Sequence, residues 1–129
     1  MEVTESLIDD YLHEVKEACS SNRYRVERNR NRADNNKLYR EYIITKQVEK
    51  EIIMSLEVED FSEIKPNEHK GFEYEDLYVF GKTVKLLERF GAEEKQVPLY
   101  IKINKLENGF VIFVSFHEEH HPLKYYFRR

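Results

Sequence analysis

The chain has 129 residues, 40% hydrophobic and 36% charged, which is enough for one domain with its own core and too apolar for wholesale disorder. A net charge of −4 excludes a uniformly basic protein, and the single cysteine, Cys19, excludes an internal disulfide. No apolar run has the length of a membrane span, and the acidic first ten residues lack the basic-then-apolar pattern of a secretion signal. We expect one cytoplasmic domain, residues 1–129, with no membrane contact.

Helical periodicity dominates the N-terminal half. Thr4 or Ser6 can cap a first helix that ends near residues 19–22, where Ser-Ser-Asn is a turn signal. Its apolar stripe is formed by Leu7, Ile8, Leu12 and Val15. Thr45 can cap a second helix, in which Val48, Ile52, Ile53 and Leu56 recur at helical spacing. Between these helices, residues 24–26 permit a short strand, and residues 28–37 fit either a helix or a charged loop.

Strand patterns dominate the C-terminal half. Residues 60–74 contain Pro66 and Gly71 and are predicted to be a loop. Strands are predicted at 77–80, 97–103 and 110–117, the last two joined by the hairpin signal Asn108-Gly109. Residues 83–96 fit either a strand pair around Gly91 or a short helix. The predicted fold class is α+β, with a small antiparallel sheet in the C-terminal half packed against the N-terminal helices.

Alternation along the strands predicts which side chains share a face of the sheet. On the 97–103 strand, Tyr100 and Lys102 lie opposite an apolar row. On the 110–117 strand, Ser115 and His117 should share a row with Val111 and Phe113, leaving Phe110, Ile112, Val114 and Phe116 for the core. Pairing the two apolar rows under the helices places Tyr100, Lys102, Ser115 and His117 on one face. Lys82 could join them near the end of its strand.

This predicted face carries the groups that RNA cleavage without a metal needs. Histidine exchanges protons near neutral pH, and lysine and arginine stabilise charge on a phosphorane. A histidine-rich and basic tail follows the last strand and includes Lys124 and Tyr125, which can contact phosphate or stack on a base. Five arginines in residues 23–32 add a dense basic segment, of which we select Arg23, Arg25, Arg28 and Arg30 as candidate RNA contacts.

Four short motifs occur in a suggestive order. They are YVFGK at 78–82, LYIKI at 99–103, VSFH at 114–117 and PLKY at 122–125. Together with Asp60-Phe61 and the arginine-rich segment, they resemble the MqsR-type toxins of bacterial and archaeal toxin–antitoxin pairs, within the RelE-like group of mRNA-cleaving toxins. The similarity touches most of the chain and is densest from 76 to 127.

The resemblance implies a RelE-like fold and a metal-independent mRNA endonuclease, acting on free or ribosome-bound mRNA and neutralised by a cognate antitoxin protein. It assigns the functional tyrosine to Tyr100 and the functional basic residue to His117, where some relatives have lysine. The family's basic residue after the Asp-Phe turn has no clean match, because Glu63 occupies its place and Lys65 lies two residues further on. In this interpretation Tyr100, His117, Lys102 and Lys82 form the catalytic set.

Other interpretations of the same residues are weaker. His117, His120 and His121 have a helical zinc-ligand spacing, but they follow a strand and precede Pro122, so we expect no metal and no other cofactor. Residues 81–83 imitate the end of a phosphate-binding loop, but Asp76 stands where that motif needs glycine. Two hypotheses of different class remain beside the endonuclease: a non-catalytic RNA- or ribosome-binding regulator, and an inactive toxin that only binds its antitoxin.

Overall fold

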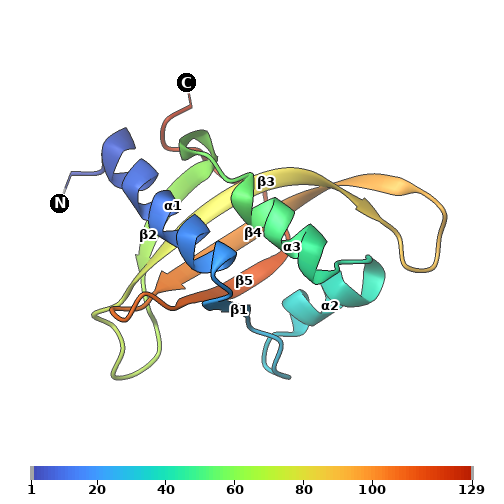
Figure 1. Cartoon of the computed structure of the whole chain (residues 1–129), viewed down its shortest axis with the longest axis horizontal. Coiled ribbons are helices and arrows are strands. Elements are labelled where there is room, and N and C mark those ends of the chain that lie inside the picture. The colour runs from blue at the N-terminus through green and yellow to red at the C-terminus, as the bar shows by residue number, and fades with distance from the viewer. Residues whose placement is uncertain (1, 129) are drawn as a thin grey trace.

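The computed structural model describes residues 2–128 and shows helices packed against a curved sheet (Figure 1). The helices are α1 (Glu5–Ser20), α2 (Ala33–Glu41) and α3 (Lys46–Met54), and a short 3₁₀ turn spans Val58–Asp60. The strands are β1 (Tyr24–Val26), β2 (Phe61–Pro66), β3 (Asp76–Leu87), β4 (Glu94–Lys105) and β5 (Val111–Glu118). The predicted α+β class is confirmed. Within residues 2–128, no helix is both long and apolar enough to cross a membrane.

The sheet has the strand order β1-β5-β4-β3-β2, and only the β1–β5 pair is parallel. The segment 83–96 is the strand pair around Gly91, the first of the two possibilities that the sequence left open. In Figure 1 this β3–β4 hairpin extends beyond the helices. The short strand that the sequence permitted at residues 24–26 is β1, which pairs in parallel with β5.

The helix caps agree with the sequence. The Thr4 side chain accepts from the Leu7 amide at 3.1 Å, and the Thr45 side chain accepts from the Val48 amide at 3.1 Å. Of residues 28–37, the first part is a loop and α2 begins at Ala33. Arg32 occupies the N-cap of α2 and makes no capping hydrogen bond with its side chain.

The predicted loop at residues 60–74 is partly wrong, because Phe61–Pro66 forms β2 at the edge of the sheet. Phe61 and Ile64 face the core, while Glu63 pairs with Val79 and Lys65 pairs with Leu77 on the other face. A register shift between Phe61 and Glu63 breaks strict alternation, which concealed the strand in the sequence.

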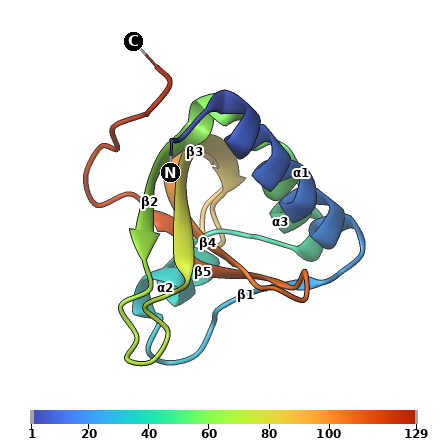
Figure 2. The ribbon, with the colours of Figure 1, turned by 90° about the vertical axis from the view of Figure 1, so that its left-hand side faces the viewer.

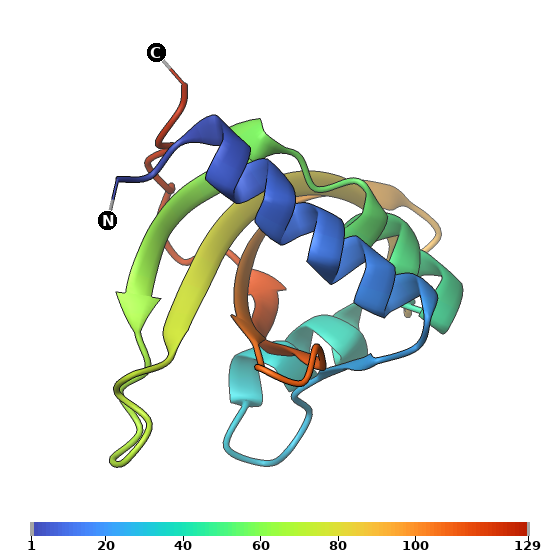
Figure 3. The same ribbon diagram turned by 60° about the vertical axis from the view of Figure 1, so that its left-hand side comes forward.

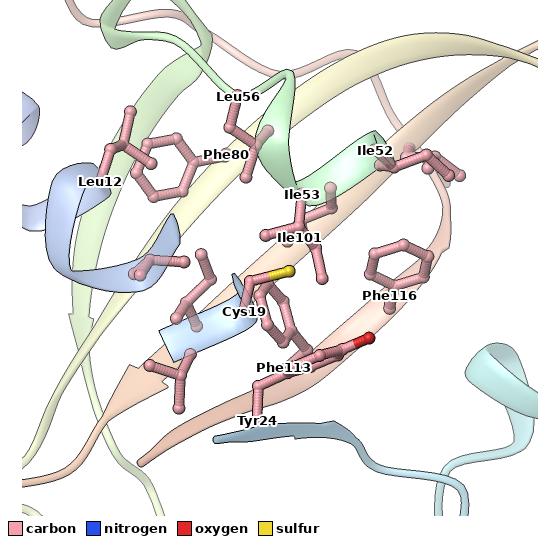
Figure 4. Packing of buried hydrophobic residues seen from close by; sticks show 14 of the residues in the cluster. Leu12, Cys19, Tyr24, Ile52, Ile53, Leu56, Phe80, Ile101, Phe113 and Phe116 are labelled. Atoms are coloured by element: carbon pink, nitrogen blue, oxygen red, sulfur yellow. The ribbon is translucent and has the colours of Figure 1, made fainter. Parts of the chain in front are cut away.

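Helices α1 and α3 cover one face of the sheet, which we call the inner face. Figure 4 shows Leu12 of α1, Ile53 of α3 and Phe80, Ile101 and Phe113 of the sheet meeting in one core, and all five side chains are buried. Figure 2 shows α1 and α3 on one side of the sheet and the C-terminal segment beyond β2 on the other. The opposite face, which we call the outer face, is therefore free of these two helices.

The C-terminal segment, residues 119–128, is fastened along β2. The Ser62 hydroxyl donates to the Lys124 carbonyl at 2.6 Å, and the Tyr126 amide donates to the Phe61 carbonyl at 3.1 Å. Gly81 is buried beneath this segment, and a Cβ atom there would collide with the Tyr125 hydroxyl and the Leu123 side chain. Glycine thus allows the segment to lie directly on the outer face of β3.

Candidate functional site

Four of the predicted side chains meet on the outer face, and we call them the Tyr100–His117 cluster: Tyr100, Lys102, Ser115 and His117. Tyr100 lies directly opposite His117 on β5, and Lys102 lies directly opposite Ser115. The rings of Tyr100 and His117 stack, with centroids 5.3 Å apart and planes 12° from parallel. The predicted grouping of these four residues is confirmed.

A β-bulge in β5 corrects the rest of the predicted row. The register shifts opposite Lys102 and Ile103, so that Ile103 pairs with Phe113 while Lys102 pairs with Ser115. Val111 and Phe113 are consequently fully buried, whereas Ile112 and Val114, which were assigned to the core, are only partly buried. The extra residue, Val114, lies before Ser115, so the assignments of Ser115, Phe116 and His117 survive the bulge.

The hydrogen bond of His117 determines which ring nitrogen is available for chemistry. Its Nδ1 lies 2.9 Å from the Glu118 carbonyl oxygen. A carbonyl oxygen only accepts, so this bond requires the hydrogen on Nδ1. In the neutral ring Nε2 then carries the lone pair and can take a proton from a substrate hydroxyl.

Tyr100 and Lys102 titrate differently from free side chains. Partial burial raises the pKa of Tyr100, with the Glu63 carboxylate adding to the shift and Lys65 opposing it. At neutral pH Tyr100 is therefore a protonated donor. Partial burial lowers the pKa of Lys102, and the nearby positive charges of Lys65 and Arg32 lower it further.

A third ring, that of His120, lies beside this pair just past the end of β5, tilted by 31° from the His117 ring. The centroid of His120 lies 5.1 Å from that of His117, and its Nε2 lies 3.5 Å from Asp34 Oδ2 of α2. These three residues border a hollow of about 270 Å³ between α2 and the end of β5. His120 is thus a direct neighbour of His117.

The C-terminal segment brings Tyr125 close to the cluster, since Tyr125 lies over Gly81 and Gly81 pairs with Tyr100. The Arg128 guanidinium lies over the Tyr125 ring at 3.8 Å from its centroid. The Lys124 side chain is exposed. Tyr125 therefore lies at one border of the cluster, and its predicted contact with a base stays a prediction.

Lys82 does not belong to this group, and its predicted place is wrong. It pairs with the inward-facing Leu99 and therefore lies on the inner face, two residues from Phe80 in the same row. Its ammonium donates to the Ser55 carbonyl at 2.9 Å and to Asp60 Oδ2 at 3.1 Å. Asp60 also accepts from Arg128 at 3.2 Å. Lys82 thus joins the end of α3 to the 3₁₀ turn.

The predicted arginines lie along the β1 edge, and three of the four make contacts within the chain. Arg23 donates to the Gly109 carbonyl at 3.2 Å, at the β4–β5 turn. Arg25 bonds the Glu27 carboxylate at 3.1 Å. Arg28 donates to Asn36 at 2.7 Å and lies 3.9 Å from the centroid of the Tyr39 ring. Arg30 is exposed in the loop before α2.

Sequence reasoning missed two cations that the fold brings to the outer face. Lys65 of β2 and Arg32 before α2 both border the same hollow as Lys102. Alternation of Glu63 and Lys65 around Ile64 was a signal for the first, had β2 been recognised. Nothing local identifies Arg32, because only the folded chain places it beside β4.

The histidines do not form a metal centre with the acidic residues. Across residues 2–128, no three His, Cys, Asp or Glu side chains are grouped so that they could hold a metal ion.

Comparison of the chain with protein-family models, with curated proteins and with solved structures finds no match in any of the three.

Proposed function

We propose that the protein is a metal-independent RNA endonuclease whose reacting groups lie in the Tyr100–His117 cluster. The observation that carries the proposal is the cross-strand pair of Tyr100 and His117, stacked at 5.3 Å with Lys102 in the next outward position. It combines a proton acceptor, a protonated hydroxyl and a cation on one rigid face.

The chemistry follows from these roles. His117 Nε2 takes the proton of a ribose 2′-hydroxyl, and the 2′-oxygen attacks the adjacent phosphorus. A bond forms between the 2′-oxygen and phosphorus as the bond to the 5′-oxygen breaks, and the leaving oxygen receives a proton from the Tyr100 hydroxyl. The products are a 2′,3′-cyclic phosphate and a 5′-hydroxyl. Lys102 stabilises the charge that develops on the non-bridging oxygens.

The cellular role in this proposal is that of a toxin in a toxin–antitoxin pair, in the cytoplasm, acting on free or ribosome-bound mRNA. The order of the four motifs, with their resemblance to MqsR-type toxins, supports this part. A cognate antitoxin is the expected protein partner. A neighbouring gene whose product relieves growth arrest on co-expression would support the assignment, and a chain that is harmless when expressed alone would contradict it.

One observation favours a second candidate, a non-catalytic RNA-binding regulator or an inactive toxin. Glu63 places a carboxylate on the outer face, close enough to Tyr100 to raise its pKa. A carboxylate repels the substrate phosphate, so binding without cleavage is the outcome that would favour this alternative.

The decisive experiment incubates purified protein with mixed cellular RNA in EDTA. We expect cleavage with 2′,3′-cyclic phosphate ends, no cleavage of the corresponding DNA, and a loss of about 10²–10⁴-fold in His117→Ala. His13→Ala, an exposed histidine on α1, is the matched control and should cleave like the wild type. Undiminished cleavage by His117→Ala would refute the assigned role.

A further inference from the structure

A hollow of about 430 Å³ lies on the outer face beside the Tyr100–His117 cluster. Arg32, Lys65 and Lys102 supply three positive charges to its wall, and Glu68 supplies one negative charge. Figure 3 shows the β2–β3 loop and the segment before α2 at the same end of the sheet, where the hollow lies. The three cations thus come from β2, β4 and a loop, which are distant in sequence.

The positive charge of this hollow is poorly neutralised. Within residues 2–128, no carboxylate oxygen lies within 4.0 Å of the side-chain nitrogens of Arg32 or Lys102, and Lys65 reaches only Glu63 at 3.9 Å. The lowered pKa of Lys102 reflects first its burial and then repulsion from Lys65 and Arg32. The three cations outnumber the two carboxylates beside them, Glu63 and Glu68, so this part of the outer face keeps a net positive charge that favours an anion.

The position of the hollow relates it to the reacting groups. Lys102 lies two residues from Tyr100 along β4, a separation of about 7 Å. The hollow continues past Lys102 to Leu77, which pairs with Asn104, a further two residues along the same strand. An RNA strand that runs along β4 with one phosphate at the cluster would bring its neighbouring phosphate to the hollow.

We propose that Arg32 and Lys65 form a second phosphate subsite, which binds the phosphate next to the scissile one in single-stranded RNA. Lys102 lies between the two phosphates and serves both. This inference rests on the proposed function, which makes the phosphate at the cluster the scissile one. Its binding test is independent of cleavage.

The test uses a fluorescently labelled, mixed-sequence 2′-deoxy 12-mer, which lacks the attacking hydroxyl and reports binding alone. Anisotropy titrations at several salt concentrations give the slope of log K against log salt. Arg32→Gln and Lys65→Gln should each weaken binding at every salt concentration and make that slope less steep by about 0.7, the value for one lost contact to a single strand. Arg32→Lys, which keeps the charge, should restore the slope.

The matched control is Lys85→Gln, because Lys85 is exposed on the outward row of β3 but pairs with Gln96, far from the hollow. It should leave the slope unchanged. Unchanged slopes in Arg32→Gln and Lys65→Gln, or an equal loss in Lys85→Gln, would overturn the subsite.

A kinetic readout separates this inference from the proposed function. On RNA, the two glutamine variants should cleave more slowly at low concentration but within about twofold of wild type at saturation, because uniform binding is lost. If the wild type cleaves RNA but Arg32→Gln and Lys65→Gln keep the wild-type salt slope, the subsite alone is refuted. Altered slopes in a protein that cleaves no RNA would refute the endonuclease alone.

Discussion

At the scale of single residues, the Tyr100–His117 pair is held by the sheet backbone. Directly opposed residues of antiparallel strands bring their side chains into contact, so neither ring depends on a loop for its place. The bond from His117 Nδ1 to the Glu118 carbonyl orients the ring further. The pair therefore has the rigidity that acid–base chemistry requires.

Replacing Tyr100 by phenylalanine separates the two contributions of this residue. Tyr100→Phe keeps the stack on His117 and removes the hydroxyl, so we expect RNA cleavage to fall by about 10²-fold or more while binding of the 2′-deoxy 12-mer stays within about twofold. Single-turnover cleavage and anisotropy measure the two quantities. Tyr100→Leu, which also removes the ring, should additionally weaken binding. Equal cleavage by Tyr100→Phe and wild type would exclude the hydroxyl as proton donor.

At the scale of elements, the side chain of Asn35 in α2 hydrogen-bonds the backbone of β5 just past the end of β1. Beyond Val26, no strand pairs with the edge of β5 that faces away from β4. There the buried Asn35 side chain donates to the Val114 carbonyl at 3.1 Å and accepts from the Phe116 amide at 2.8 Å. The same amide group donates to the Glu27 carbonyl at 2.9 Å. One side chain thus satisfies the bulged edge of β5 immediately before His117.

Asn35→Ala should therefore destabilise the fold by about 2–4 kcal/mol, because it leaves buried backbone groups without partners. Urea denaturation gives this difference in the free energy of unfolding. Asn31→Ala is the control, since Asn31 is exposed in the preceding loop. A loss below about 0.5 kcal/mol in Asn35→Ala would show that water replaces the amide at no cost.

At the scale of the whole molecule, one buried carboxylate connects three elements. Glu49 of α3 accepts from the hydroxyls of Tyr24 on β1, at 2.7 Å, and of Tyr39 on α2, at 2.5 Å. Burial, followed by the bond to Glu49, raises the pKa of both tyrosines well above the usual value. Burial raises the pKa of Tyr11 in α1 as well.

These shifts predict loss of stability in alkali. A tyrosine whose folded pKa is raised contributes stability that is complete below its unfolded pKa, about 10, and that falls as pH rises above it. The folded pKa of Lys102 is lowered, so its contribution has the opposite sign: it increases stability as pH rises from its folded pKa to its unfolded pKa. We expect the free energy of unfolding to decrease from about pH 10 upward, by as much as about 1.4 kcal/mol per pH unit for each such tyrosine.

Tyr39→Phe tests the origin of this slope. Its free energy of unfolding, measured by urea denaturation from pH 8 to 11, should decrease less steeply above pH 10 than that of the wild type. The comparison cancels the contribution of Lys102, which both proteins share. Parallel curves would mean that Tyr39 does not titrate on unfolding.

The sequence by itself determined the helix caps at Thr4 and Thr45, the α+β class and the grouping of Tyr100, Lys102, Ser115 and His117. These features follow from local chemistry and from the period of two along strands, which one chain segment contains in full. Tertiary structure alone decided the rest. The bulge in β5 turned Val111 and Phe113 from the predicted outer face to the inner face. The pairing with Leu99 placed Lys82 on the inner face, and the fold brought Arg32 and Lys65 beside Lys102. Each of these placements depends on contacts between segments that are distant in the sequence.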